Sequence, residues 1–158
     1  MALLSRKVDY ALLILWYLHH HPEGGCARAI AGRFGLSRAF VANILKELCH
    51  RGLVTSHRGV KGGYLLHRPA QEVSLAELME ALDESFRFAE CNRVDPISGC
   101  SLAGICPVKG PVGVVHNRIR EVLRTITLAE LFPALQPPER PAGRVPVAVA
   151  TVCTAANL

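Results

Sequence analysis

The chain has 158 residues, half of them hydrophobic, and a formal net charge of +5. This length fits one domain with an appended segment and allows a hydrophobic core. Six cysteines are too few, in a chain this long, for a small secreted protein held together by disulfides. Residues 1–68 carry ten Lys/Arg and three Asp/Glu, a balance of +7, whereas residues 69–158 carry eight and ten, a balance of −2. We therefore expect the first half to bind a polyanion, the alternative being a basic face that is merely solvated.

The first long apolar run is YALLILWYL, residues 10–18. Nine residues cannot cross a bilayer, which needs about 20, and three histidines follow where a signal peptide has a small-residue cleavage site. We read the run as a buried helix in a cytoplasmic protein that makes no membrane contact. Ser5 can cap this helix, which we expect to reach about Leu18.

Two further helices are expected in the first half. A short one fits Ala27 to Phe34, and Gly35 permits a tight turn after it. Ser37 suits the N-cap of the next helix, in which apolar residues recur at helical spacing until the sequence His50-Arg51-Gly52.

The period then changes to that of a β-hairpin. Residues 53–56 and 64–66 read as two strands, joined by a basic, glycine-rich tip at residues 57–63. Ser74-Leu75-Ala76-Glu77 has the pattern of a capping box that opens a helix to about Leu82. A long helix is expected from about Pro111 to Ile126, and a second capping box, Thr127 to Glu130, starts a short final helix. From Pro137 onward we expect a disordered tail.

This order of elements is that of a winged helix-turn-helix, so the predicted fold is mainly α with a small β-hairpin wing. The fold places its second motif helix in the major groove of DNA, where base edges can be distinguished. Arg38 and Asn43 suit guanine and adenine, and Ser37 and Lys46 suit phosphates, although Ser37 could simply cap the helix. The predicted DNA contacts are Ser37, Arg38, Ala39, Phe40, Asn43, Lys46, Arg58, Gly59 and Lys61, the last three on the hairpin tip.

The segment CNRVDPISGCSLAGIC places Cys91, Cys100 and Cys106 together. Clustered cysteines in a cytoplasmic protein are more often ligands or redox groups than bridges. Thiolates suit iron–sulfur clusters or zinc, and intervals of eight and five residues let one loop wrap a cluster. Zinc sites more often use Cys-x-x-Cys pairs, which the chain lacks. The sequence therefore favours a cluster over zinc, and structural thiols without a cofactor are the remaining alternative.

Several stretches together resemble one family of bacterial winged-helix regulators, which includes the iron–sulfur regulator IscR and the nitric-oxide sensor NsrR. They span roughly residues 3–133 and are RKVDYALLIL, FGLSRAFVANILKEL, GLVTSHRGVKGGYLL, SLAELMEALDES, the three cysteines ahead of a long helix, and TLAEL. The resemblance implies a homodimer in which the long helix crosses its symmetry mate, and a DNA affinity that responds to a bound cluster.

The resemblance also suggests a fourth ligand. IscR-like members use a histidine three residues after the last cysteine, but Lys109 stands there and its ammonium cannot coordinate iron. NsrR-like members use an aspartate of the other subunit's first helix, and Asp9 matches it in KVDYAL. We therefore expect Cys91, Cys100, Cys106 and Asp9 to be the metal ligands, with His116 in reserve, and a 4Fe-4S rather than a 2Fe-2S cluster. A salt bridge to Arg6 or to another basic group is the alternative role for Asp9.

The function predicted from sequence is that of a DNA-binding transcriptional repressor, controlled by a cluster that senses nitric oxide, redox state or iron–sulfur status. The alternative is a cluster-free regulator of the same family that responds to a small molecule or a protein partner. An electron carrier would have no reason for a basic winged helix, and no catalytic arrangement is legible, so we expect a protein that is not an enzyme. The expected divisions are residues 1–83 (DNA binding), 84–110 (cysteine loop), 111–133 (dimerisation helix and final helix) and 134–158 (tail).

Overall fold

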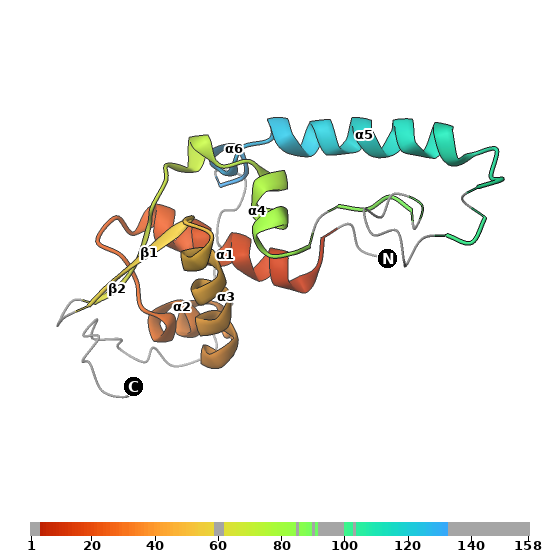
Figure 1. Cartoon of the computed structure of the whole chain (residues 1–158). Helices are drawn as coiled ribbons and strands as arrows, with labels where there is room; N and C mark the ends of the chain where they lie inside the picture. Colours follow the sequence, from red (N-terminus) through yellow and green to blue (C-terminus); the bar gives the residue numbers. More distant parts are fainter. Residues whose placement is uncertain are drawn as a thin grey trace, which may run out of the picture.

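The computed structural model describes residues 4–58, 62–84, 86–89, 91, 100–102 and 104–132. It confirms a mainly helical fold with one two-stranded hairpin (Figure 1). The elements in chain order are α1 (Arg6–His20), α2 (Ala27–Phe34), α3 (Arg38–His50), β1 (Val54–His57), β2 (Gly63–Leu66), the 3-10 helix η1 (Ala70–Glu72), α4 (Leu75–Ala81), α5 (Lys109–Thr125) and α6 (Leu128–Leu131).

The first three helices form the helix-turn-helix unit. Ser5 caps α1 as expected, because its Oγ accepts a hydrogen bond from the Val8 amide at 3.3 Å. The helix continues two residues past the predicted end, since the His20 ring bonds back to the Trp16 carbonyl at 2.9 Å. Gly35 ends α2 with a φ of 70°, a left-handed conformation that glycine adopts without strain.

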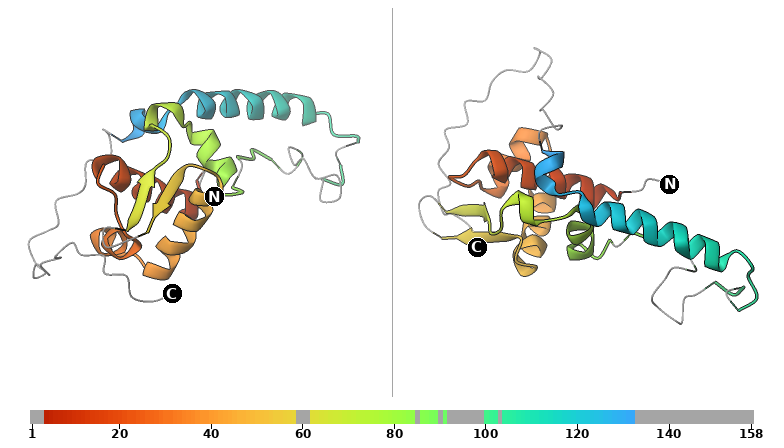
Figure 2. Two further views of the ribbon diagram at one scale, coloured as in Figure 1. Left: turned by 60° about the vertical axis from the view of Figure 1, so that its left-hand side comes forward. Right: turned by 90° about the horizontal axis from the view of Figure 1, so that it is seen from above.

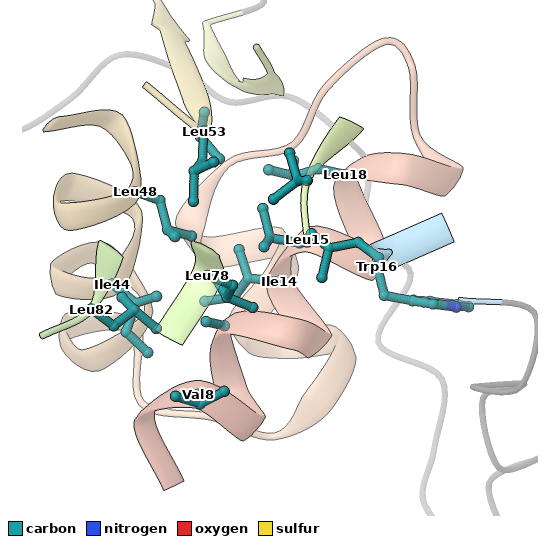
Figure 3. Packing of buried hydrophobic residues seen from close by; sticks show 14 of the residues in the cluster. Val8, Ile14, Leu15, Trp16, Leu18, Ile44, Leu48, Leu53, Leu78 and Leu82 are labelled. Carbon is teal, nitrogen blue, oxygen red and sulfur yellow. The ribbon is translucent and has the colours of Figure 1, made fainter. Parts of the chain in front are cut away.

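The core lies where α1, α3 and α4 meet (Figure 3). Ile14 and Leu15 of α1 pack with Ile44 and Leu48 of α3 and with Leu78 of α4, all almost completely buried. A fully buried side chain of this size contributes about 1.5–3 kcal/mol to folding. This packing fixes α3 against the rest of the molecule and leaves its opposite face outside.

The wing is an antiparallel pair in which Val54 is opposite Leu66 and His57 is opposite Gly63. The first strand is shifted one residue from its predicted bounds, because Leu53 belongs to the turn that leaves α3, where its amide donates to the Leu48 carbonyl at 3.0 Å. The second strand starts one residue earlier than predicted and ends at Leu66 as predicted. Gly25 adds a third stretch of chain to the hairpin through two hydrogen bonds with Tyr64, of 3.0 and 2.9 Å.

Of the two predicted capping boxes, one forms completely and the other only in part. Thr127 and Glu130 form a complete box at α6, as expected. At α4 the Ser74 hydroxyl accepts from the Glu77 amide at 3.2 Å, but the Glu77 carboxylate pairs with Arg68 instead of closing the box. A tertiary ion pair therefore replaces half of the local motif.

The long helix α5 projects from the body of the molecule (Figures 1 and 2). It spans Lys109–Thr125 instead of the predicted Pro111 to Ile126, because a proline is tolerated in the first turn of a helix. Leu123 is its one buried residue among those described, at 5% exposed. Trp16 Nε1 donates to the Phe132 carbonyl at 3.2 Å, so the chain after α5 is tied back to α1. The expected tail from Pro137 lies outside the described residues.

Within the described part of the chain, no helix is both long and apolar enough to span a membrane.

Candidate DNA-binding surface and cysteine segment

The two faces of α3 differ sharply. Val41, Ile44, Leu45 and Leu48 form its buried face. The opposite face is exposed and carries, at helical spacing, Ala39, Asn43, Lys46 and His50. Ser37, Arg38 and Phe40, at the start of the helix, are exposed as well. The predicted contacts of this helix are therefore all exposed, and we call residues 37–40, 43, 46 and 50 together the recognition face.

Ser37 occupies the N-cap position but does not cap with its side chain. Its backbone has the extended conformation of an N-cap, with φ −64° and ψ 127°, yet its hydroxyl makes no cap hydrogen bond. The hydroxyl is therefore available to a phosphate, a role that also suits the positive end of the helix dipole at this position.

Phe40 is held on one side by the first helix. Its ring meets the ring of Tyr10 edge-on, with centroids 5.3 Å apart and planes at 85°. Such a pair stabilises by about 0.5–1.5 kcal/mol beyond its buried area. Phe40 remains 37% exposed, which leaves part of its ring available for an apolar contact such as a thymine methyl group.

The wing carries the remaining predicted DNA contacts. Arg58 is exposed directly after β1, beside the exposed His57. Gly59 and Lys61 lie outside the described residues, so their placement stays a prediction. The wing follows α3 through a tight turn in which Gly52 has a φ of 71°. Arg58 therefore lies at the end of the strand that comes directly after the recognition helix.

Sequence reasoning missed His50, the last residue of the recognition face. Its place follows from the helical period, since Asn43, Lys46 and His50 are spaced three and four residues apart. All three line a groove of about 610 Å³ between α3, the start of α1 and the end of α4. The side of this groove nearest α1 and α4 contains Lys7, Glu47, Arg51 and Asp83.

The cysteines of residues 91–106 are described at three points. Cys91, Cys100 and Cys106 are free thiols of intermediate burial. Cys106 precedes α5, and its carbonyl accepts from the Lys109 amide at 3.4 Å, while residues 92–99 lie outside the described part. Their donor chemistry fits an iron–sulfur cluster, but no three His, Cys, Asp or Glu side chains among the described residues gather as a metal site.

The two candidates for the fourth ligand differ in their surroundings. Asp9 is exposed in the first turn of α1 and makes no ion pair with any described residue, so the alternative pairing with Arg6 is not formed. His116 on α5 stacks its ring on Phe86 at 5.4 Å. Its Nδ1 is buried and has no hydrogen-bond partner among the described atoms. Among the described residues, each side chain therefore has an atom able to bind iron that has no other partner: a carboxylate oxygen in Asp9 and Nδ1 in His116.

Cys49 belongs to the core side of α3 and not to the cysteine segment. It is half-buried and packs against the hydrophobic cluster. Burial raises the pKa of its thiol, which disfavours the reactive thiolate. This agrees with the sequence-based expectation that Cys49 is a small packing residue.

Comparison with known proteins identifies relatives over nearly the same span. Residues 4–134 match the model of the Rrf2 family, described as "Iron-dependent Transcriptional regulator". The protein aau3 of Rhizobium meliloti (strain 1021) is 33% identical over 132 residues, which is 83% of this chain and 85% of the relative. The HTH-type transcriptional regulator IscR of Serratia proteamaculans (strain 568) is 34% identical over 130 residues, or 81% of this chain and 77% of the relative.

Solved structures agree with the fold. A structure titled T. potens IscR superposes with a TM-score of 0.64 at 28% identity, covering 84% of this chain and 88% of that one. CymR of B. subtilis, titled the global cysteine regulator, superposes with a TM-score of 0.65 at 25% identity, covering 86% of this chain and 100% of that one.

Proposed function

Because the chain belongs to the Rrf2 family of transcriptional regulators, we propose that it binds operator DNA as a homodimer and that an iron–sulfur cluster held by the cysteine segment controls this binding. The observation that carries the proposal is the recognition face: an exposed, polar helix surface beside a basic wing, in a half of the chain with a balance of +7. Such a regulator acts in the cytoplasm, where bacterial DNA lies. It represses while the cluster is intact.

DNA recognition is assigned to the recognition face and the wing. Arg38 and Asn43 present donors and acceptors that match guanine and adenine edges in the major groove. Ser37, Lys46 and Arg58 contact phosphates, which position the protein without reading sequence. Ala39 and Phe40 supply apolar contacts, and Gly59 and Lys61 extend the wing contact.

Dimerisation is assigned to α5. Its valines Val114, Val115 and Val122 are 53%, 41% and 56% exposed. A helix with an unburied apolar side is stabilised when a second copy covers it. Two chains paired along α5 carry two recognition helices and therefore bind two half-sites.

The cluster site is assigned to Cys91, Cys100 and Cys106, with Asp9 of the other subunit as the fourth ligand and a 4Fe-4S cluster as the group. Three thiolates and one carboxylate would supply one ligand to each of the four irons of such a cluster, and the carboxylate, an oxygen ligand among soft thiolates, would be the one most easily replaced. The divisions at residues 83, 110 and 133 remain our proposal for the DNA-binding unit, the cysteine loop, the dimerisation segment and the tail.

A cluster-free regulator is the second candidate. The similarity to CymR supports it, because that structure is titled a global cysteine regulator and its title names no iron or cluster. In that case the same DNA surface responds to a small molecule or to a protein partner. Only the metal content separates the two candidates.

Iron and sulfide analysis on protein purified without oxygen tests the proposal. We expect about four iron and four sulfide per chain, visible absorption, and loss of both in the variant C91A. Binding to a duplex selected from a random-sequence pool should weaken after nitric oxide is added. The variants D9N and H116Q separate the two fourth ligands, because only the true ligand changes the visible spectrum. Colourless, iron-free protein whose DNA binding is unaffected by nitric oxide would leave the second candidate.

A further inference from the structure

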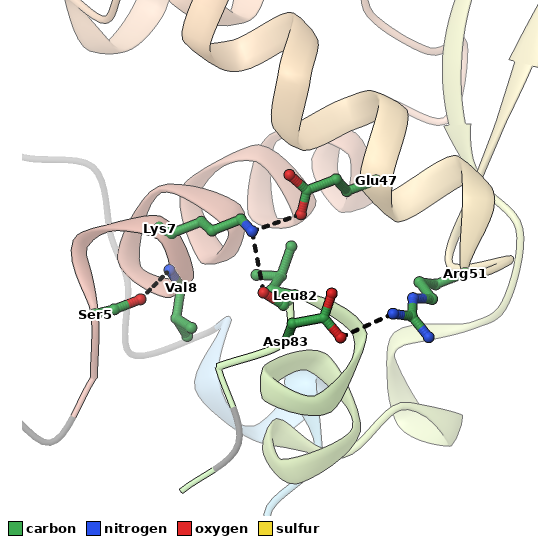
Figure 4. Close-up of polar contacts among 7 residues, drawn as sticks. All are labelled: Ser5, Lys7, Val8, Glu47, Arg51, Leu82 and Asp83. Carbon is green, nitrogen blue, oxygen red and sulfur yellow. Dashed lines mark hydrogen bonds and ion pairs between the residues drawn. The ribbon is translucent and has the colours of Figure 1, made fainter. Parts of the chain in front are cut away.

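Three elements meet at Lys7 (Figure 4). The Lys7 ammonium lies 2.7 Å from the Glu47 carboxylate of α3. It also donates a hydrogen bond to the carbonyl of Leu82, at the end of α4, at 3.0 Å. One side chain of α1 therefore holds both the recognition helix and the point where the chain leaves α4 for the cysteine segment.

The chain beyond α4 has a second tie to α3. Asp83 adopts a φ of 56°, the one left-handed non-glycine residue in the described part of the chain. Its carboxylate lies 2.9 Å from the guanidinium of Arg51, directly after α3. The backbone at residues 82–84 is further fixed by the Glu84 amide, which donates to the Met79 carbonyl at 2.9 Å. The exit from α4 is thus held in one conformation against the end of α3.

The Lys7–Glu47 pair has a geometric role more than an energetic one. Its side chains are 29% and 41% exposed, and a pair this accessible contributes little to folding stability. Its position is specific, however. Lys7 and Tyr10 are one turn apart on α1 and contact Glu47 and Phe40, which are two turns apart on α3. These contacts fix the direction of the recognition helix along most of its length.

We infer that Lys7 is a positioning residue for DNA recognition. It sets the orientation of α3 relative to α1, and it holds α3 in a fixed position relative to the start of the cysteine-bearing chain. This inference rests on the proposed DNA-binding function of α3. A displacement of the Leu82 carbonyl is then transmitted to Glu47 through a single ammonium group.

The rival explanation is that Lys7 contacts a DNA phosphate directly. The two explanations predict opposite changes in DNA affinity when the charge of Glu47 is removed. If Lys7 positions α3, the change E47Q weakens sequence-specific binding, because the helix loses its anchor. If the surface acts only through charge, E47Q strengthens binding, because a negative charge near the phosphates is removed.

The experiment measures binding of the full-length chain to a duplex selected from a random-sequence pool and to a shuffled duplex, over a range of salt concentrations. The variants are K7M, E47Q and the double variant. The matched control is E80Q, which removes a carboxylate that is 46% exposed and pairs at 2.9 Å with Arg120 of α5 and not with a residue of α3. Thermal melting by circular dichroism confirms that each variant is folded at the binding temperature.

We expect K7M and E47Q each to weaken binding to the selected duplex roughly fivefold or more, a loss comparable to one base contact. The double variant should be no weaker than K7M alone, because K7M already removes the Glu47 contact. Binding to the shuffled duplex, the salt dependence and the E80Q variant should match the wild type.

A salt slope lowered by about one in K7M, together with tighter binding by E47Q, would overturn the inference in favour of a phosphate contact. Unchanged binding in K7M and E47Q would overturn it as well. If the wild-type chain itself prefers no duplex over the shuffled one, the failure belongs to the proposed function.

Discussion

At the scale of single residues, Gly25 occupies a place where no side chain fits. A Cβ there would lie 2.5 Å from Cε1 of Tyr17, a ring that is 9% exposed, while the backbone of Gly25 pairs with Tyr64 of the wing. We expect Gly25→Ala to destabilise the fold by about 1–3 kcal/mol, the usual cost of overpacking. Chemical denaturation measures this change in the free energy of unfolding.

Gly32 is the matched control for this substitution. It lies inside α2, and a Cβ there would meet no described atom within 4 Å. Gly32→Ala is expected to stabilise the protein by roughly 0.5–1 kcal/mol, because alanine loses less backbone entropy in a helix. A similar loss of stability in both variants would contradict the steric explanation for Gly25.

The residues that sequence reasoning identified well are those whose role is local. The exposure of Arg38, Asn43 and Lys46 follows from the apolar period of α3 alone. The contacts of Lys7 with Leu82, 75 residues away, and of Glu77 with Arg68 depend on how the elements pack. No local pattern encodes such contacts, so they were not predicted.

At the scale of elements, the serines at the starts of α3 and α4 have different roles. The hydroxyl of Ser37 makes no cap bond, whereas Ser74 accepts from the Glu77 amide at 3.2 Å. We expect Ser37→Ala to leave the melting temperature close to that of the wild type and to weaken DNA binding about two- to tenfold, the effect of losing one hydrogen bond.

Ser74→Ala provides the comparison, since its hydroxyl caps α4 far from the recognition face. Loss of this cap should cost about 1 kcal/mol of stability and leave DNA affinity unchanged. The melting temperature and the affinity, measured together for both variants, should therefore change in opposite patterns. A Ser37→Ala protein that melts lower but binds DNA normally would show that Ser37 only caps.

Element boundaries could be predicted where the sequence carries a strong local signal, such as a glycine that ends a helix. The bounds of α2 were predicted correctly, because Gly35 ends the helix by its backbone conformation. The first strand of the wing was shifted by one residue, because the Leu48 carbonyl holds Leu53 in the turn after α3. The ligand geometry of the cysteine segment could not be read in this way, since a loop without a periodic pattern carries no such signal.

At the scale of the whole molecule, α5 consists of a C-terminal part that packs against the body and an N-terminal part that projects from it. Leu123 and the chain around Thr127 are bound to the body, through Leu123 burial and the bridge between Ser74 and Thr127. The N-terminal half of the helix projects away from the body (Figure 2), and no valine of α5 belongs to the described core cluster. A rigid anchored arm suits a dimer interface, because any rotation of α5 also rotates the DNA-binding unit.

The variant V115E tests this arrangement, because Val115 is 41% exposed on the apolar side of α5. A buried charge at the interface should convert the dimer into a monomer at micromolar concentration, as measured by analytical ultracentrifugation. Affinity for a duplex with two half-sites should fall by roughly 10²-fold, since the second recognition helix is no longer tethered. N117E is the control, because Asn117 is exposed on the side of the helix opposite Val115 and Val122 and receives the same new charge. Equal behaviour of the two variants would place the dimer interface elsewhere, and the two half-sites would then have to be bridged by a surface other than α5.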